Sequence, residues 1–430
     1  MKLQKELEAL IEAAVIDETT AEKISQYYKA KQDAAPNRLF IAFGVLGATL
    51  VGLGIILIIG HNWDQFPRVV KTVFAFIPLV IGQVFAAYTL LKRPESAVWR
   101  ESTAVFVTFA MGACIALISQ IYHIQGELSG FLFTWTLLCL PLFYVMRSSA
   151  TAMLYLIGVT FYGFEYGFWS YPSLPPYWYL VMLAALMPYY YWCYRNRPNS
   201  NSMNFFNWLV PISVLTVFGA FSNTFPVLLH VGFVSLFGLF IAVGNLDFFQ
   251  GQKSRNNGYK ILGELGTIFM ILMLSFEDLW SRIGRKVNDF NLGELSYTVE
   301  FWTVLLVTLA AIALLYRRYA KHGFENISLL SVIFLLFIPI FWIGSLIGGG
   351  PVLMNLLTLI VGVLIIRAGS QQNHLGQLNL GLLTVAALIT CRFFDTDLSF
   401  VIRGIIFVVL GASFFAANYW MIKKRKTHEQ

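Results

Sequence analysis

The sequence predicts an all-α membrane protein: a polytopic bundle of about 14 transmembrane helices, preceded by a short cytosolic helical hairpin. Hydrophobic residues make up 57% of the 430-residue chain and charged residues only 12%, and the mean hydropathy is +0.67. Soluble globular chains carry about 25% charged residues, so a soluble core could not absorb this much apolar surface. Apolar runs recur along the chain, and most of them are long enough to cross a bilayer as a helix.

Fourteen apolar runs define the expected spans. They cover approximately residues 39–59, 69–91, 103–120, 129–146, 150–169, 177–194, 206–222, 225–246, 259–276, 299–316, 327–347, 352–366, 377–394 and 400–422. The short run at 352–366 follows Gly348-Gly349-Gly350-Pro351, which predicts a tight turn between two helices. The alternative is that this run or the one before it is re-entrant and does not cross the membrane.

The distribution of basic residues gives these spans a direction. If the N-terminus is cytosolic, 23 of the 30 lysines and arginines fall in cytosolic segments and seven fall outside. Cytosolic loops of membrane proteins are enriched in Lys and Arg. The alternation therefore predicts that both termini lie in the cytosol. It also accounts for the net charge of +7 without a nucleic-acid partner.

Three regions follow from this pattern: a cytosolic helical hairpin (1–38), the transmembrane domain (39–422) and a basic cytosolic tail (423–430). In the hairpin, Thr19 and Glu22 fit a capping box that would start its second helix. About 30 residues are too few to build much of a core alone. We expect the hairpin to dock on the membrane domain, on a protein partner or on another copy of itself, and a solvated appendage is the plain alternative. The lipid bilayer is the other expected partner, and the oligomeric state stays open.

Polar residues gather at the outer ends of several spans. The candidates for an outward-facing polar pocket are His61, Asn62, Trp63, Asp64, Gln120, Tyr122, His123, Glu127, Arg392, Asp395, Asp397 and Arg403. Ionisable groups at membrane depth are costly, so they tend to face protein or water and often mark function. The competing interpretation is structural, because Trp63 and Tyr122 suit an aromatic belt and Arg392 can pair with Asp395 one helical turn away.

No motif points to a catalytic centre, a metal or a cofactor. A zinc site built from His61, Asp64, His123 and Glu127 has the right donor types but no ligand spacing that supports it. Nucleotide-binding loops and nucleophile elbows are absent from the sequence, so we expect no cofactor, no metal and no standard hydrolase. Inside the spans, Glu264 is the clearest isolated carboxylate. It suits a proton or cation pathway, and an ion pair with Lys260 one turn earlier is the simpler interpretation.

Several short motifs occur in a recognisable order. The hairpin segment Leu10–Asp17 leads to Ala21–Ile24, then to Asn62-Trp63, Gln120–His123 and finally Arg392–Asp395. This order resembles the DUF2157 family of bacterial multispanning membrane proteins, best over residues 1–150, while Arg392–Asp395 resembles the end of longer members. The resemblance implies an inner-membrane location. It implies no catalytic residues, because the function of the family is unknown.

Three classes of function fit these observations. The first is a transporter or flippase-like protein, which suits many spans and the absence of a large soluble domain. The second is a non-catalytic scaffold or sensor that recruits a partner through the hairpin. The third is an enzyme that modifies envelope glycans or lipids, with Asp395, Asp397, His61 and His123 as candidates at the outer face.

Overall fold

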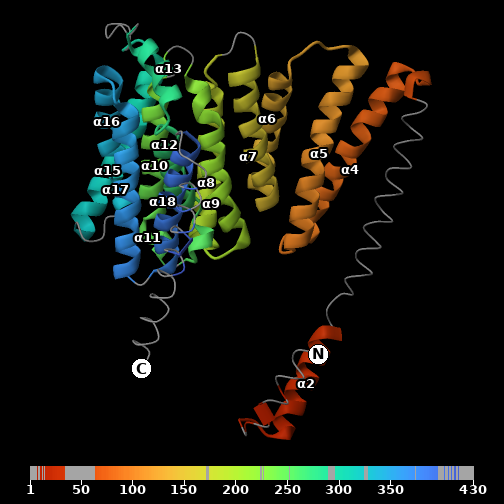
Figure 1. Ribbon diagram of the computed structural model, residues 1–430. Coiled ribbons are helices and arrows are strands. Elements are labelled where there is room, and N and C mark those ends of the chain that lie inside the picture. The colour runs from red at the N-terminus through yellow and green to blue at the C-terminus, as the bar shows by residue number, and fades with distance from the viewer. Residues whose placement is uncertain are drawn as a thin grey trace. The chain divides into compact units, whose positions relative to one another are not determined.

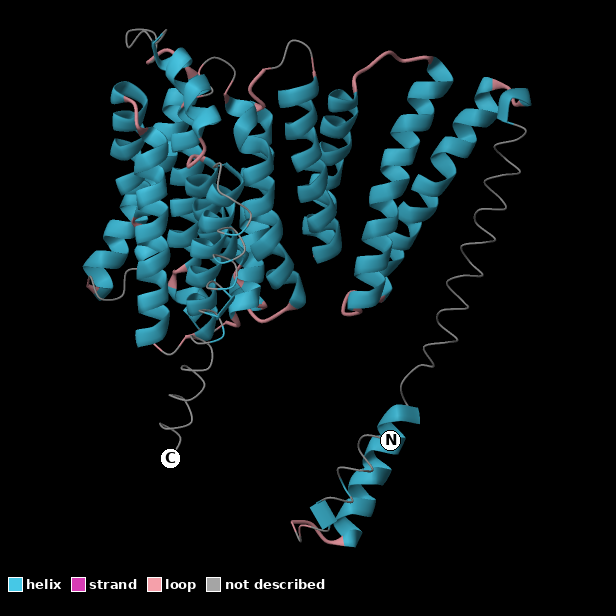
Figure 2. Cartoon of the chain, viewed as in Figure 1, coloured by secondary structure: helices cyan, strands magenta, loops and turns pink. Residues whose placement is uncertain are grey.

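In the computed structural model of the protein, the described residues form helices and connections, without a strand among them (Figure 2). These residues are 15–33, 63–170, 174–222, 227–250, 252–288, 296–323, 328–372 and 374–395, together with Leu7, Leu10, Ile11, Ala13, Phe225, Val401, Ile405, Val408, Gly411, Ala412 and Phe415. The chain divides into two compact units, Met1–Ala75 and Phe76–Gln430. Each unit is described by itself.

The first unit holds α2 (Glu18–Asp33), the 3₁₀ turn η1 (Trp63–Gln65) and the start of α4 (Arg68–Lys92). Helix α2 begins before the predicted cap at Thr19. Asp17 takes the capping position instead: its carboxylate accepts a hydrogen bond from the Thr19 hydroxyl, and its carbonyl accepts from the backbone N–H of Ala21 at 3.0 Å. The predicted span at 39–59 and the hairpin boundary at residue 38 lie outside the described residues.

The second unit contains the remaining helices (Figure 1). They are α5 (Ala97–Tyr122), α6 (Leu128–Met146), α7 (Ser149–Phe164), η2 (Glu165–Trp169), α8 (Tyr177–Asn196), α9 (Asn201–Phe218), η3 (Gly219–Phe221), α10 (Leu228–Gly244), α11 (Asp247–Gln250), η4 (Ser254–Asn256), α12 (Gly258–Met273), α13 (Glu277–Asn288), α15 (Val299–His322), η6 (Leu329–Ser331), α16 (Ile333–Ile347), α17 (Gly350–Gln371) and α18 (Leu375–Asp395). Helix α10 is central, since it packs against α12, α15 and α16.

Helices coincide with twelve of the fourteen predicted apolar runs. Of the described helices, seven are long and apolar enough to cross a membrane, and α10 and α16 are shorter apolar helices. The all-α membrane bundle is therefore confirmed. The count of fourteen stays a prediction, because the run at 39–59 lies outside the described residues and only six single positions describe 400–422.

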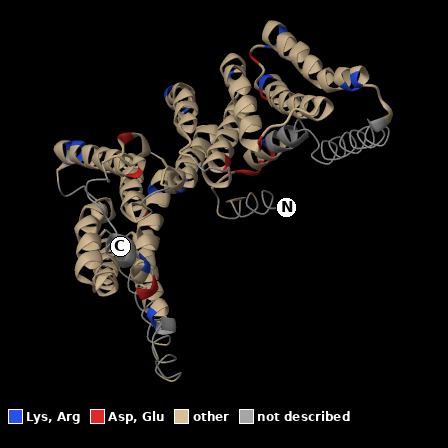
Figure 3. Cartoon of the chain, turned by 90° about the horizontal axis from the view of Figure 1, so that it is seen from above, with Lys and Arg blue, Asp and Glu red and all other residues tan. Residues whose placement is uncertain are grey.

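Charge is sparse along the helices, as Figure 3 shows by the mostly tan ribbons. Large apolar side chains are instead exposed along them, such as Val84 on α4, Phe161 on α7 and Phe269 on α12, each with about 62–63% of its surface exposed. In water such exposure would be costly, whereas in a bilayer these side chains meet lipid tails of similar polarity. The exposed apolar surface thus fits helices that face lipid.

The turn between α16 and α17 is as tight as its glycines predict. Gly348 and Gly349 adopt φ values of +85° and +73°, a region that is strained for residues with a side chain. Helix α17 has 22 residues, which is enough to cross the hydrocarbon core. The length of α17 thus favours a full span for residues 352–366, while the re-entrant alternative stays open for the preceding run, where α16 has only 15 residues.

The connection after α12 contains a further helix that the apolar pattern did not predict. The chain bends by 84° between α12 and α13. Helix α13 buries Trp280 and Ile283 and exposes Glu277, Asp278 and Arg282, the pattern of an amphipathic helix at a membrane surface. The bend exposes backbone carbonyls, and side chains satisfy them: Trp280 Nε1 donates to the Leu274 carbonyl at 2.6 Å.

Glycines bring the last two described helices into backbone contact. A Cβ atom on Gly381 of α18 would lie 2.7 Å from the Ile366 nitrogen and 2.9 Å from the Gly362 carbonyl oxygen on α17. Real Cβ atoms essentially never lie under 3.0 Å from another heavy atom. Small residues commonly allow such close packing of membrane helices.

We expect Gly381→Ala to lower the free energy of unfolding by about 1–3 kcal/mol, because the new methyl group overpacks a backbone contact. Gly130→Ala on α6 is the matched control, since a Cβ there meets nothing within 4 Å. The control should leave stability unchanged or raise it, because alanine favours a helix over glycine. Thermal unfolding in detergent measures both, and equal effects would contradict the close α17–α18 packing.

The predicted orientation can be tested by labelling single cysteines with a membrane-impermeant maleimide, in a chain whose four native cysteines are serines. We expect Gln125→Cys, between α5 and α6, to react in intact cells. Ser254→Cys, between α11 and α12, should react only after the membrane is permeabilised. The reverse pattern would invert the topology.

Candidate binding pocket

The predicted outer residues of the α5–α6 connection are exposed. Gln120, Tyr122, His123 and Glu127 all lie at its surface. Two hydrogen bonds between Ser119 and Ile124 stabilise the turn. The Ile124 backbone N–H donates to the Ser119 carbonyl at 2.9 Å, and the Ser119 hydroxyl donates to the Ile124 carbonyl at 3.0 Å. The Glu127 carboxylate accepts from the Ser129 hydroxyl at 3.3 Å. These four residues form an exposed turn.

Arg392 contacts a different part of the fold. Its guanidinium lies 4.7 Å from the ring centroid of Phe276 and donates to the Ser275 hydroxyl at 3.4 Å. Both partners belong to the bend between α12 and α13. A cation over an aromatic face is a favourable contact, so Arg392 joins α18 to this bend.

The remaining predicted outer residues lie in the first unit or outside the described residues. Trp63 belongs to the first unit, where the Lys71 ammonium lies 5.7 Å from its ring centroid. His61, Asn62, Asp397 and Arg403 lie outside the described residues, as do the side chains of Asp64 and Asp395. Convergence of the twelve residues on one outer pocket stays a prediction.

A large pocket of about 710 Å³ lies at the other end of the second unit's helices. We call it the aromatic pocket, and it lies between the end of α8, the α10–α11 junction, the start of α12 and the end of α15. Its lining residues are Met187, Tyr190, Tyr191, Tyr194, Met203, Ala242, Val243, Asn245, Leu246, Asp247, Phe248, Phe249, Tyr259, Leu314, Arg317, Arg318 and Lys321. These helix ends are the ones that the charge pattern assigns to the cytosol.

The aromatic pocket has a buried floor and an exposed rim. Met203 and Tyr259 are almost completely buried, at 1% and 8% exposure. Tyr191 and Leu246 on the rim are 58% and 43% exposed. A ligand could therefore enter from the rim and reach the floor without unfolding a helix.

Aromatic rings form one wall. Tyr194 meets Phe248 edge-on with ring centroids 4.6 Å apart, and Phe248 meets Phe249 at 4.8 Å. Phe249 continues the series to Tyr259 at 6.1 Å. Edge-on ring pairs of this kind add to the stability gained from burial, so the wall is a connected unit that spans α8, α11 and α12.

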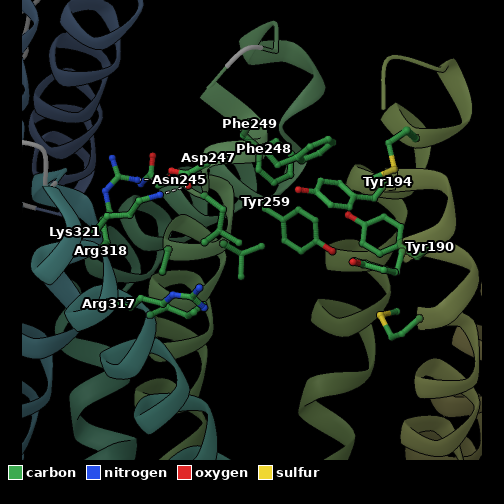
Figure 4. A pocket seen from close by; sticks show the side chains of 17 residues that line it. Tyr190, Tyr194, Asn245, Asp247, Phe248, Phe249, Tyr259, Arg317, Arg318 and Lys321 are labelled. Carbon is green, nitrogen blue, oxygen red and sulfur yellow. Dashed lines mark hydrogen bonds and ion pairs between the residues drawn. The ribbon is translucent and has the colours of Figure 1, made fainter. Parts of the chain in front are cut away.

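Cations form the opposite wall, all from the last turns of α15. Figure 4 shows Arg317, Arg318 and Lys321 on one side of the pocket, with Tyr190 and Tyr194 on the other. Lys321 forms an ion pair with Asp247, the one carboxylate among the lining residues. Three cations against one carboxylate give the pocket a positive surplus.

Arg318 also serves the fold. Its guanidinium donates to the carbonyl of Asn245, the residue that ends α10. A cation at a helix C-terminus complements the helix dipole, and α15 itself ends in the same region. Earlier on α15, the Thr308 hydroxyl donates to the Ser235 hydroxyl of α10 at 2.8 Å, which joins the two helices. The cationic wall is thus held at a fixed place beside α10.

Asn257 positions the floor. Its side-chain carbonyl accepts from the Lys260 backbone N–H at 3.0 Å, which caps the start of α12. Its side-chain amide donates to the Gly244 carbonyl at 2.7 Å, which caps the end of α10. One buried side chain therefore satisfies two helix ends and brings them together.

A second set of polar contacts fixes the aromatic wall. The Tyr190 hydroxyl donates to Asn207 Oδ1 at 2.8 Å, and Asn207 Nδ2 donates to the Asn256 carbonyl at 3.4 Å. Nearby, Trp208 Nε1 donates to the Arg255 carbonyl at 3.0 Å. Helices α8 and α9 are in this way tied to the segment that precedes α12.

This arrangement suits an amphipathic anion. An aromatic wall provides apolar contact area, and arginine presents several donors in a plane that matches phosphate geometry. Metal ligation has no comparable support, because no three His, Cys, Asp or Glu side chains gather among the residues that the structure describes. Glu264, the isolated carboxylate of α12, lies 3.9 Å from the Lys260 ammonium, which agrees with the ion pair expected from their spacing.

The sequence contains two signals of this pocket that polarity at the outer span ends does not reveal. Tyr190, Tyr191 and Tyr194 share one face of α8 at helical spacing, and Arg317-Arg318 is followed by Lys321 one turn later. The basic residues were explained by the positive-inside rule, which accounts for their side of the membrane but not for their proximity to aromatic residues. That proximity depends on which helices pack together.

Comparison with known proteins agrees with the membrane fold and supplies no activity. No curated protein and no solved structure matches the chain significantly. The family model described as "Predicted membrane protein (DUF2157)" matches residues 8–152, which is about a third of the chain. The aromatic pocket, formed by residues 187–321, lies beyond that region. The N-terminal third of this protein is therefore similar to the DUF2157 family, as the order of its motifs indicated.

Proposed function

We propose that the protein is a flippase-like transporter of the bacterial inner membrane that takes up an anionic lipid from the cytosolic leaflet. The observation that carries this proposal is the aromatic pocket, in which three cations face a wall of aromatic rings. The charge pattern predicts that both termini lie in the cytosol, and with that orientation the pocket opens toward the cytosolic lipid headgroups.

The chemistry of the walls favours a lipid over a soluble anion. A soluble phosphate needs donors on most sides, whereas the rim here includes the exposed apolar residues Tyr191 and Leu246. Tyrosine suits the membrane interface because its ring is apolar and its hydroxyl is polar. Anionic lipids of the cytosolic leaflet attract nearby Lys and Arg side chains. A lipid phosphate beside Arg317 and Arg318 would leave its chains in contact with the aromatic wall.

The aromatic pocket replaces the outer polar cluster as the basis for a transport function. The outer residues of the α5–α6 connection are exposed, and their convergence with the other outer residues stays a prediction. The aromatic pocket, in contrast, has a volume within the range of about 300–1,000 Å³ that is common for ligand pockets.

We expect Arg317→Gln to weaken binding of phosphatidylglycerol about tenfold to a hundredfold, and Arg317→Gln with Arg318→Gln to weaken it further. Each change removes a charge-assisted contact to phosphate, worth roughly 1.5–3 kcal/mol when well formed. Binding is measured by native mass spectrometry of the full chain. In proteoliposomes, the same variants should slow the flipping of labelled phosphatidylglycerol, followed by dithionite quenching.

Arg367→Gln on α17 is the matched control, since it removes the same charge from an exposed arginine on the same predicted face, away from the pocket. It should leave binding and flipping unchanged. Equal losses in Arg317→Gln and Arg367→Gln would mean that general surface charge attracts the lipid, and binding without flipping would leave a lipid-binding protein that is not a transporter.

A further inference from the structure

A second, smaller hollow of about 330 Å³ lies beside the aromatic pocket. We call it the polar hollow. It shares Asn245, Phe249 and Arg318 with the aromatic pocket. The rest of its lining comes from the end of α10, the segment before α12, the first turns of α12 and the start of α18. Arg318 therefore stands at the junction of the two spaces.

The polar hollow differs from the aromatic pocket in chemistry. Its lining includes Gln252, Lys260, Glu264, His374 and Gln377. The Lys260 and Glu264 side chains form an ion pair at 3.9 Å, so their charges largely offset each other. His374 Nδ1 accepts from the Gln377 backbone N–H at 3.2 Å, which occupies one ring nitrogen at the start of α18. The hollow is thus polar with little net charge apart from Arg318.

Three side-chain atoms in this lining are buried and have no hydrogen-bond partner among the residues that the structure describes. They are the acceptors Gln252 Oε1 and Gln377 Oε1 and the donor Asn245 Nδ2. The other end of the Gln252 amide is fixed, because its Nε2 donates to the Pro198 carbonyl at 3.3 Å. A buried polar atom without a partner costs about 1–3 kcal/mol, so these atoms favour a ligand that can pair with them.

One unpaired donor and two unpaired acceptors together favour a particular kind of ligand group. A hydroxyl both donates and accepts, so a hydroxyl-rich group matches this mixture of donor and acceptors in type. An ammonium only donates, would leave Asn245 Nδ2 unsatisfied, and would lie near the cations Lys260 and Arg318. A carboxylate only accepts, and would leave both glutamine oxygens unsatisfied.

We propose that the aromatic pocket and the polar hollow form one bipartite site for a phospholipid with an uncharged, hydroxyl-rich headgroup, such as glycerol or a sugar. The phosphate lies at Arg318, the chains contact the aromatic wall, and the headgroup hydroxyls fill the polar hollow. This inference rests on the proposed lipid-binding function and names the class of lipid.

The test compares three lipids with identical chains by native mass spectrometry of the full protein: phosphatidylglycerol, phosphatidic acid and phosphatidylethanolamine. The wild type should bind phosphatidylglycerol about tenfold more tightly than the other two, because a site built for hydroxyls discriminates against a ligand that lacks them. Gln252→Met with Gln377→Met should reduce binding of phosphatidylglycerol to the level of phosphatidic acid and leave phosphatidic acid unchanged.

Gln371→Met, an exposed glutamine at the end of α17 outside the hollow, is the control and should keep the preference. Gln377→Met alone should reduce the preference partially, which provides a test if the double variant does not fold. Glycerol phosphate is added as a competitor, and displacement of the lipid at equal concentration would indicate a soluble ligand instead.

The outcomes separate the two proposals. If no anionic lipid binds, the proposed function fails. If phosphatidylglycerol and phosphatidic acid bind equally to the wild type, lipid binding stands and the headgroup site is wrong, with the polar hollow holding only water. If the double variant Gln252→Met with Gln377→Met still prefers phosphatidylglycerol over phosphatidic acid, the headgroup binds outside the polar hollow. The proposed bipartite site is then also wrong.

Discussion

The pocket region depends on the way Asn257 satisfies two helix ends with one side chain. Helix ends leave backbone groups without intrahelical partners, and in a membrane protein water cannot be relied on to supply them. Asn257 donates to the last turn of α10 and accepts from the first turn of α12. Close packing makes this possible, since a Cβ on Gly263 would lie 2.7 Å from the Phe237 carbonyl oxygen of α10. The aromatic pocket and the polar hollow both lie at this junction.

Most of the architecture could be predicted from the sequence, because the bilayer imposes a strong pattern on it. Apolar runs located twelve helices, and Gly348 and Gly349 marked the tight turn before α17. The hydropathy pattern did not predict the elements that lack a long apolar run. Helix α13 is too polar to register as an apolar run, yet it folds as an amphipathic helix around Trp280 and Ile283. The 84° bend before it has no hydropathy signal.

The candidate site was harder to predict, for a physical reason. Charge and polarity read along one chain identify residues that are unusual for their depth, such as His123 and Arg392. A pocket arises from contacts between helices that are distant in sequence: Tyr194 of α8, Phe248 of α11 and Arg318 of α15 come together only because α10 packs against α12 and α15. Hydropathy contains no information on those pairings. The positive-inside rule explains Arg317 and Arg318 by their side of the membrane alone, so their presence in the sequence does not indicate a binding site.

Arg318 shows why a structural role and a binding role need not compete. Its donation to the Asn245 carbonyl fixes the guanidinium at the C-terminus of α10. A guanidinium has five N–H donors, more than one carbonyl oxygen can accept. An arginine held in this way is already ordered before a phosphate arrives, so binding loses less side-chain entropy. A lysine could form one of these contacts but not the planar pair that phosphate favours. The contact that stabilises the helix end therefore also prepares the cation at the junction of the two spaces.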